Sequence, residues 1–309
     1  MGYSRILRSR GWCVAAAVAV LCASGCDPRD KVPALSYTPS NAAEIRRLLQ
    51  QAPQESGGEE AAPTAEPDGW GTLKGKFVVN GTPPVRVPLT VNKDTEVCSP
   101  GGKQPLAETV VVGAEGELQN VLVFLTTPIA ADNPKWLHES YAEARSAEVL
   151  FDQKNCVFLS HVASMWAPQT LKVLNSDPVG HNTNLDSKRG AAAGNFTVAA
   201  NSSALYQPGK ASPAPFPVSC SIHPWMSAWL MVCESPYFAV TAADGTFEIK
   251  NLPAGVPLEF RVWQEKANFL QQVTVNGEAQ KWNRGRFTVT LAKDEQRDVN
   301  VAVDATIFE

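Results

Sequence analysis

From Trp70 to the C-terminus, the sequence repeats short apolar runs rich in β-branched residues and separated by Gly, Pro and Asn. Residues 73–79 end at Asn80-Gly81, a dipeptide that favours a hairpin turn, and residues 121–125 form a further apolar run. This pattern is typical of an all-β protein built from sandwiches. Residues 133–146 are more helical in composition, and we expect an irregular loop with a possible turn of helix.

The strand pattern changes after Pro236. Up to residue 235 we expect a Greek-key sandwich with an N-terminal β extension, over residues 69–235. Residues 236–309 carry shorter runs, with turns predicted at Asp244-Gly245 and Asn276-Gly277. Their Gly-x-Phe, short strand and Pro-x-Gly turn resemble the carboxypeptidase-regulatory-like β-sandwich. The resemblance implies a second, smaller sandwich and says little about function.

The N-terminus has the features of a bacterial secretory signal. Three arginines in the first ten residues precede an apolar run at 12–21 that ends in small residues. Residues 21–26 resemble a lipobox, which implies a lipoprotein signal peptide at 1–25 and lipidation of Cys26. Ordinary cleavage without lipid is the alternative. Residues 26–68 are rich in Pro, Ala, Glu and Gln, so we expect a flexible tether. The expected location is the periplasmic side of a membrane, whether inner or outer.

Composition argues against several classes of protein. The charged fraction of 19% and the net charge of −4 give no sign of nucleic-acid binding. No Cys-x-x-Cys-His, Gly-x-Ser-x-Gly or Walker loop occurs, so haem attachment, hydrolase and nucleotide-binding functions lack support. The chain has four histidines, too few for a multicopper oxidase. We therefore expect a protein that is not an enzyme.

Three soft or borderline metal ligands occur within seven residues, at Cys220, His223 and Met226. Copper in an electron-transfer site takes one Cys and two His, with a weak axial Met, so a second His must come from elsewhere. The candidate is His181, which follows the apolar run 171–174 and a turn-like stretch. We expect a strand followed by a turn that presents this imidazole at a loop tip. Taken singly, each of these residues is more often an ordinary core residue.

Taken together, Asn-x-Asp followed by His-Asn, and then a distant Cys-x-x-His-x-x-Met, resemble the cupredoxins, with a short amicyanin- or plastocyanin-like ligand loop. The resemblance implies one mononuclear type 1 copper. It also implies a hydrogen bond from Asn182 to the backbone near Ser221. The implied copper ligands are His181, Cys220, His223 and Met226.

The resemblance implies electron transfer, with the exposed edge of the loop histidine as the exit for electrons. Trp225 and Ile222 are candidates for a docking patch, and a core role for either is the alternative. The expected partner is a c-type cytochrome or a periplasmic dehydrogenase. Competing hypotheses are a periplasmic or cell-surface binding module whose cupredoxin half is structural, and copper storage or delivery. His138 and His161 remain unassigned; His161 could be a second metal ligand or a relay, but a structural role is favoured.

Four cysteines remain after the signal region and Cys26. An oxidising compartment permits a disulfide. Cys98 and Cys156 are the preferred pair because both follow polar, turn-like stretches. Cys233 ends an apolar run, and we expect it to be a buried free thiol. Connectivity cannot be deduced from a sequence alone, so other pairings stay open.

Overall fold

The computed structural model describes residues 65–129 and 132–309. The predicted signal peptide, the lipidation site Cys26 and nearly all of the predicted tether lie outside these residues. Within the described part, no helix is long and apolar enough to cross a membrane. The chain is all-β, with 45% of residues in strands and 9% in helices, as the alternating pattern predicted.

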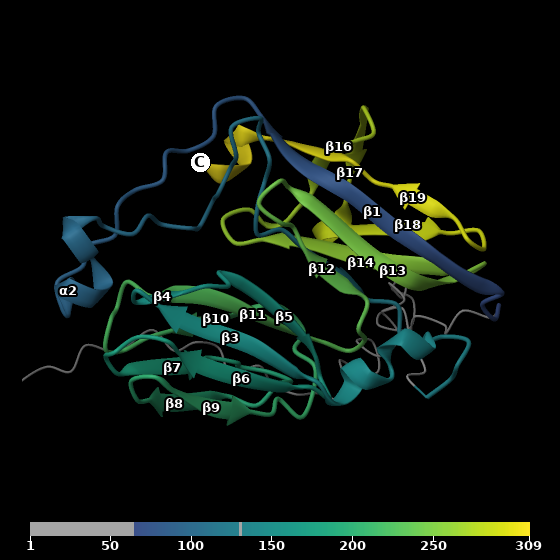
Figure 1. The fold of residues 1–309 in the computed structure, drawn as a ribbon. Helices are drawn as coiled ribbons and strands as arrows, with labels where there is room; N and C mark the ends of the chain where they lie inside the picture. The colour runs from purple at the N-terminus through teal and green to yellow at the C-terminus, as the bar shows by residue number, and fades with distance from the viewer. Residues whose placement is uncertain (1–64, 130–131) are drawn as a thin grey trace, which may run out of the picture. The chain divides into compact units, whose positions relative to one another are not determined.

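A first sandwich, the central sandwich, comprises residues 148–233 (Figure 1). One sheet has the order β5-β11-β10-β7-β8 and the other the order β4-β3-β6-β9. Its strands are β3 (Glu148–Lys154), β4 (Val157–Phe158), β5 (Val162–Trp166), β6 (Thr170–Asn175), β7 (His181–Leu185), β8 (Gly194–Val198), β9 (Ser202–Tyr206), β10 (Phe216–Ser219) and β11 (Ser227–Cys233).

A second sandwich, the split sandwich, combines strands from both sides of the first. One sheet has the order β13-β1-β20-β16-β17, with β19 beside β1, and the other the order β12-β2-β14-β15, with β18 beside β14. Its strands are β1 (Gly69–Asn80), β2 (Leu122–Leu125), β12 (Phe238–Val240), β13 (Thr246–Ala254), β14 (Pro257–Gln264), β15 (Asn268–Phe269), β16 (Gln272–Val275), β17 (Glu278–Lys281), β18 (Arg286–Thr290), β19 (Gln296–Asp298) and β20 (Val301–Asp304).

Short helices lie in the connections between strands and after the last strand. They are α2 (Thr95–Cys98), η1 (Pro100–Gly102), η2 (Glu139–Tyr141), η3 (Glu143–Ser146), η4 (Asn283–Gly285) and η5 (Ala305–Phe308). The two helices η2 and η3 are single 3₁₀ turns, which agrees with the irregular segment expected at 133–146.

The strand pairing differs from the predicted domain division at 69–235. β1 pairs with β13, β19 and β20, and β2 pairs with β12 and β14, so both belong to the split sandwich. The central sandwich is therefore an insertion between β2 and β12. The predicted hairpin at Asn80-Gly81 is wrong, because no partner of β1 follows it directly in the chain. The predicted hairpin at Asn276-Gly277 joins β16 to β17.

Each sandwich has its own core. Leu73 and Phe77 of β1 pack in one core with residues of the C-terminal strands, which is why β1 joins that sheet. A small third cluster lies between the sandwiches, where Leu122 and Phe124 meet Met231 and Cys233. Cys233 is a buried free thiol, as its apolar context predicted.

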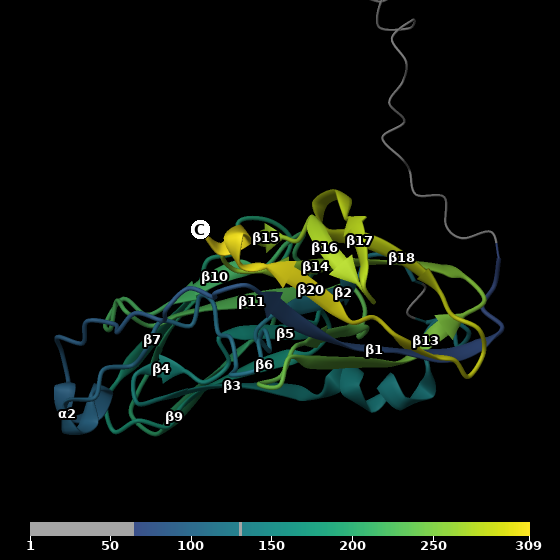
Figure 2. The same ribbon diagram turned by 90° about the horizontal axis from the view of Figure 1, so that it is seen from above.

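The connection from β1 to β2 carries a segment to one end of the central sandwich. In both views α2 lies beside the loops at that end (Figures 1 and 2). These loops are distant from α2 in the sequence. We call residues 91–102 the cap. Val91 and Cys98 of the cap are buried in the core of the central sandwich. A disulfide joins Cys98 to Cys156, the pairing that the sequence favoured.

Candidate metal centre

His181 is the first residue of β7 and is fully buried, rather than exposed at a loop tip. The preceding turn is held by Asn175, whose side-chain amide donates to the carbonyl oxygens of Val179, Val198 and Ala199 at 2.8–3.1 Å. Because the turn folds back onto β8 in this way, the next residue enters the sheet. The imidazole of His181 therefore lies in the interior.

The stretch from Cys220 to Met226 connects β10 to β11, two paired antiparallel strands. Its backbone closes on itself, since the N–H of Met226 donates to the carbonyl of His223 at 2.9 Å and that of Cys220 to Met226 at 3.3 Å. Pro224 adds a fixed φ angle to the loop. Cys220, His223 and Met226 are all buried as a result.

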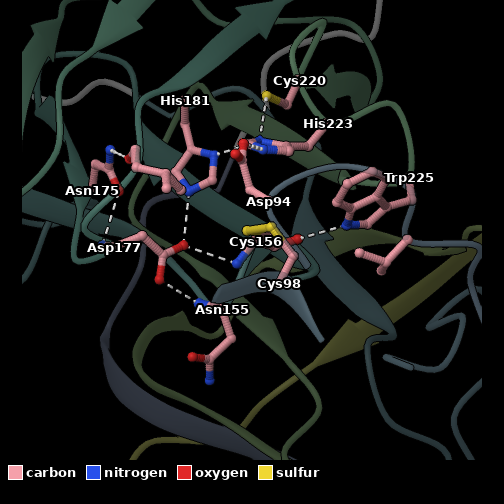
Figure 3. The surroundings of a disulfide bond; sticks show 12 residues. Asp94, Cys98, Asn155, Cys156, Asn175, Asp177, His181, Cys220, His223 and Trp225 are labelled. Atoms are coloured by element: carbon pink, nitrogen blue, oxygen red, sulfur yellow. Dashed lines mark hydrogen bonds and ion pairs between the residues drawn. A yellow bond between two sulfur atoms is a disulfide. The ribbon is translucent and has the colours of Figure 1, made fainter. Parts of the chain in front are cut away.

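These two segments bring three donor groups together (Figure 3). The Nδ1 atoms of His181 and His223 are 2.9 Å apart, and the Cys220 Sγ lies 3.9 Å from the Nδ1 of His223. Ligand atoms of all three residues lie within 4.8 Å of one another. A thiolate and two imidazole nitrogens fit a soft or borderline metal such as copper or zinc. The three residues could therefore hold such an ion between them.

Two neighbours support this cluster through hydrogen bonds. The backbone N–H of Asn182 donates to the Cys220 Sγ at 3.4 Å. The backbone N–H of Ser221 donates to the Oδ1 of Asn182 at 2.9 Å, the contact that the cupredoxin resemblance led us to expect. Asn182 thus links the β7 and β10–β11 sides of the site.

Met226 and the two apolar loop residues pack into the central core. Met226 is 1% exposed and belongs to the same buried cluster as Cys220, while Ile222 and Trp225 are partly buried against it. The Trp225 indole N–H donates to the carbonyl of Cys156 at 3.1 Å. The core role considered for Ile222 and Trp225 is therefore realised, and Trp225 keeps an exposed part beside the exposed Pro224.

The expectation that the edge of His223 is open to solvent is wrong. His223 is fully buried, and its Nε2 lies 2.8 Å from the Oδ2 of Asp94 in the cap. The other histidine has a similar partner, since the Nε2 of His181 lies 2.7 Å from the Oδ2 of Asp177. Sequence reasoning assigned neither aspartate a role. Asp177 had a signal, as the Asp of the Asn-x-Asp motif, but Asp94 lies 129 positions before His223 and had none.

Burial, charges and hydrogen bonds in the cluster lower the pKa of the Cys220 thiol and shift the pKa values of the two histidines in opposite directions. Burial alone would lower the pKa of His181, but hydrogen bonds with Asp177 and Cys220 raise it to about 9. Burial opposes ionisation of Cys220 as well, yet the hydrogen bonds from His181 and the backbone hold its pKa below the ordinary value. Burial and the nearby His181 lower the pKa of His223, despite its contact with Asp94. The lowered pKa of Cys220 favours the thiolate that a metal ion binds, and binding would displace a proton from the imidazole pair.

The two unassigned histidines lie elsewhere. His138 contacts Ser140 and the edge of Trp70. His161 is buried between two carboxylates: its Nε2 is 2.5 Å from Glu265, and its Nδ1 is 3.7 Å from Glu108. Because the carboxylates face opposite ring nitrogens, His161 cannot bind one metal ion together with both. It joins the central sandwich to the segment after β14.

This contact predicts a pH-dependent contribution to stability. Burial would raise the pKa of Glu265, but the hydrogen bond and charge of His161 hold it below the ordinary value of 4.5. A lowered folded-state pKa stabilises the fold above pH 4.5, and this contribution is lost as the pH falls through the folded-state pKa. Glu265→Gln is therefore expected to lower the free energy of unfolding by about 2 kcal/mol at pH 7, measured by urea denaturation.

The difference between Glu265→Gln and the wild type should shrink as the pH falls from 4.5 through the folded-state pKa, because the carboxyl group then becomes neutral in the folded chain as well as in the unfolded chain. Glu278→Gln, at an exposed position of β17, serves as the control and should change stability little at any pH. A Glu265→Gln deficit that stays constant from pH 7 to pH 3 would contradict the ionic role of the pair.

No protein-family model matches the chain, and no curated protein matches it. Among solved structures, the copper-containing nitrite reductase of Thermus scotoductus SA-01 is similar over 29% of this chain and 23% of its own, at 18% identity and a TM-score of 0.27. A Cu(I) mutant of amicyanin is similar over 36% of this chain and 98% of its own, at 16% identity and a TM-score of 0.26. At these scores the similarities carry no functional inference. The likeness of residues 236–309 to the carboxypeptidase-regulatory sandwich stays a prediction.

Proposed function

We propose that the protein is a mononuclear blue copper electron carrier and not an enzyme. The observation that supports this most directly is the buried cluster in which the Nδ1 atoms of His181 and His223 face the Cys220 sulfur. Met226, three residues after His223 in the same closed loop, would supply a weak thioether ligand as the fourth donor. When bound, copper would supply a one-electron couple between Cu(I) and Cu(II).

The protein side chains would keep the ligand geometry nearly constant during electron transfer. His181 is fixed by β7 and its turn, and Cys220 and His223 by the closed β10–β11 loop. Both imidazoles are fully buried, so water is excluded from the ring atoms. A rigid, dry set of donors undergoes little reorganisation when the charge of the site changes.

With the His223 edge covered, electrons need another route to the surface. The Trp225 ring lies 5.1 Å from the His223 ring and is partly exposed. We infer that a redox partner, a c-type cytochrome or a periplasmic dehydrogenase, docks at Trp225 and Pro224. The sequence further supports a lipid anchor at Cys26, with residues 26–68 as a spacer that lets the folded part reach this partner from the periplasmic face of the membrane.

The test is spectroscopy and voltammetry on the full chain, solubilised in detergent and loaded with Cu(II). We expect an intense visible thiolate-to-copper band, an electron paramagnetic resonance spectrum of a blue site, and a reversible one-electron wave. Readily chelated copper without a reversible wave would favour storage or delivery. A colourless protein that does not retain copper would favour the binding-module hypothesis.

A further inference from the structure

Each histidine of the cluster has one nitrogen that faces the other ligands and one that contacts a carboxylate. The Nδ1 atoms face each other, while the Nε2 atoms of His181 and His223 contact Asp177 and Asp94 at 2.7 and 2.8 Å (Figure 3). A carboxylate acceptor holds a ring proton on Nε2 and makes Nδ1 the nitrogen that a metal would bind. It also makes that nitrogen a stronger donor.

Asp94 has an unusual local conformation beside this contact. It occupies the N-cap position of α2, where an Asp side chain normally accepts a hydrogen bond from the first turn of the helix. Its side chain makes no such bond, and its backbone is left-handed, with φ 48° and ψ 40°. The left-handed region is unfavourable by roughly 1–2 kcal/mol for residues with a β-carbon, although Asp tolerates it better than most. The carboxylate that would have capped the helix reaches His223 instead.

Asp177 is held even more firmly. Besides His181, its carboxylate accepts the backbone N–H groups of Asn155 at 2.6 Å and Cys156 at 2.8 Å. Its own backbone N–H donates to the Asn175 side chain at 3.0 Å. Asp177 is 2% exposed, so its charge acts on the cluster with little screening by water.

The disulfide connects the two segments that position these carboxylates. Cys98 lies in α2, four positions after Asp94, and the N–H of Cys156 is bound by Asp177. One covalent bridge therefore holds the cap, with Asp94, against the turn that Asp177 organises. The sulfur atoms of the bridge themselves lie within 4.8 Å of a ring nitrogen of His223.

We propose that Asp94 and Asp177 are positioning residues that lower the reduction potential of the bound copper, and that the Cys98–Cys156 disulfide holds both in place. This inference rests on the proposed function. The Cys220 thiolate and two carboxylates place three negative charges around the ion. Cu(II) leaves a net charge of −1 and Cu(I) a net charge of −2, so each carboxylate favours the oxidised ion. Asp177 acts from a buried position, whereas the Asp94 side chain is 34% exposed and water screens its charge more strongly. The stronger imidazole donors act in the same direction.

Asp94→Asn tests this proposal most directly. One oxygen of Asp94 accepts the hydrogen bond from His223, and the carbonyl oxygen of Asn can accept the same bond. The substitution removes the charge and keeps the contact. We expect the Cu(II):Cu(I) ratio at a fixed ambient potential to fall about tenfold. For a one-electron couple this equals a rise in midpoint potential of about 59 mV, measured by voltammetry on the full chain. Glu96→Gln, an exposed acid in the same helix, is the matched control and should leave the potential unchanged.

The role of the bridge is tested by combining variants. Cys98→Ala/Cys156→Ala should raise the potential in the same direction as Asp94→Asn. Adding Asp94→Asn to it should then have a smaller effect than in the wild type, since residues that act through one contact are not additive. Full additivity would overturn the proposed role of the disulfide.

A measurement without copper checks the two contacts directly. In the metal-free protein, NMR should show two protected imidazole Nε2–H protons, and Asp94→Ala should lose the one on His223 and keep the one on His181. A blue wild type with an unchanged potential in Asp94→Asn would overturn this inference and leave the proposed function standing. A wild type without a thiolate-to-copper band would overturn both.

Discussion

Replacing Cys220 by Ser is expected to abolish the visible thiolate-to-copper band and to weaken copper binding at least about a hundredfold. The hydroxyl of Ser is a poor ligand for Cu(I) and Cu(II) compared with a thiolate, and loss of a residue that only hydrogen-bonds to a ligand already lowers metal affinity about 10–100-fold. The neighbours of Cys220 lower its pKa, which favours the thiolate form that binds copper. Absorption spectroscopy and competition with a copper chelator measure the two effects.

Cys233→Ser provides the matched control. Cys233 is the other buried free thiol in the described residues, but it lies at the end of β11 in the cluster between the two sandwiches. Burial raises the pKa of the Cys233 thiol, which keeps it protonated. Its replacement should leave the band in place. A band that survives in Cys220→Ser, or that disappears in Cys233→Ser, would contradict the assignment of the ligand.

Removing the disulfide is expected to lower the free energy of unfolding by about 4 kcal/mol. The two cysteines are 58 positions apart, and closing a loop of that length removes this much chain entropy from the unfolded state. Cys98→Ala/Cys156→Ala is the variant, and urea denaturation followed by tryptophan fluorescence is the measurement. Copper should also dissociate faster, because the cap that covers His223 is no longer tied to the central sandwich.

Wild-type protein kept in a dithiol reductant is the companion sample. Once the bridge is broken chemically, it should unfold at the same urea concentration as the double variant. An unchanged midpoint in the double variant would show that Val91 and the Asp94–His223 contact hold the cap without the bridge.

The local sequence was enough to predict the structural features that depend on residues close together in the chain. The alternation of apolar residues marked most strands, because a residue's neighbours two positions away face the same side of a sheet. Asn276-Gly277 marked a hairpin, since the turn needs only positive φ at adjacent residues. The close spacing of Cys220 and His223 put two donors on one loop.

The local sequence could not predict which strands pair with one another. The backbone of β1 can satisfy its hydrogen bonds equally well with any strand of suitable length. Its pairing with β13, β19 and β20 reflects which faces bury best together. The same limit hid the insertion of the central sandwich between β2 and β12, because adjacency in the chain favoured joining β1 and β2 to the strands that follow.

The sequence by itself determined an all-β chain, the spacing of Cys220, His223 and Met226, and the polar contexts that favoured pairing Cys98 with Cys156. The tertiary structure decided that His181 begins a buried strand, and that Asp94 covers a histidine 129 positions away. Such contacts depend on where long connections run, and that path is set by the packing of whole sheets. No periodicity within a few residues of Asp94 carries information about it.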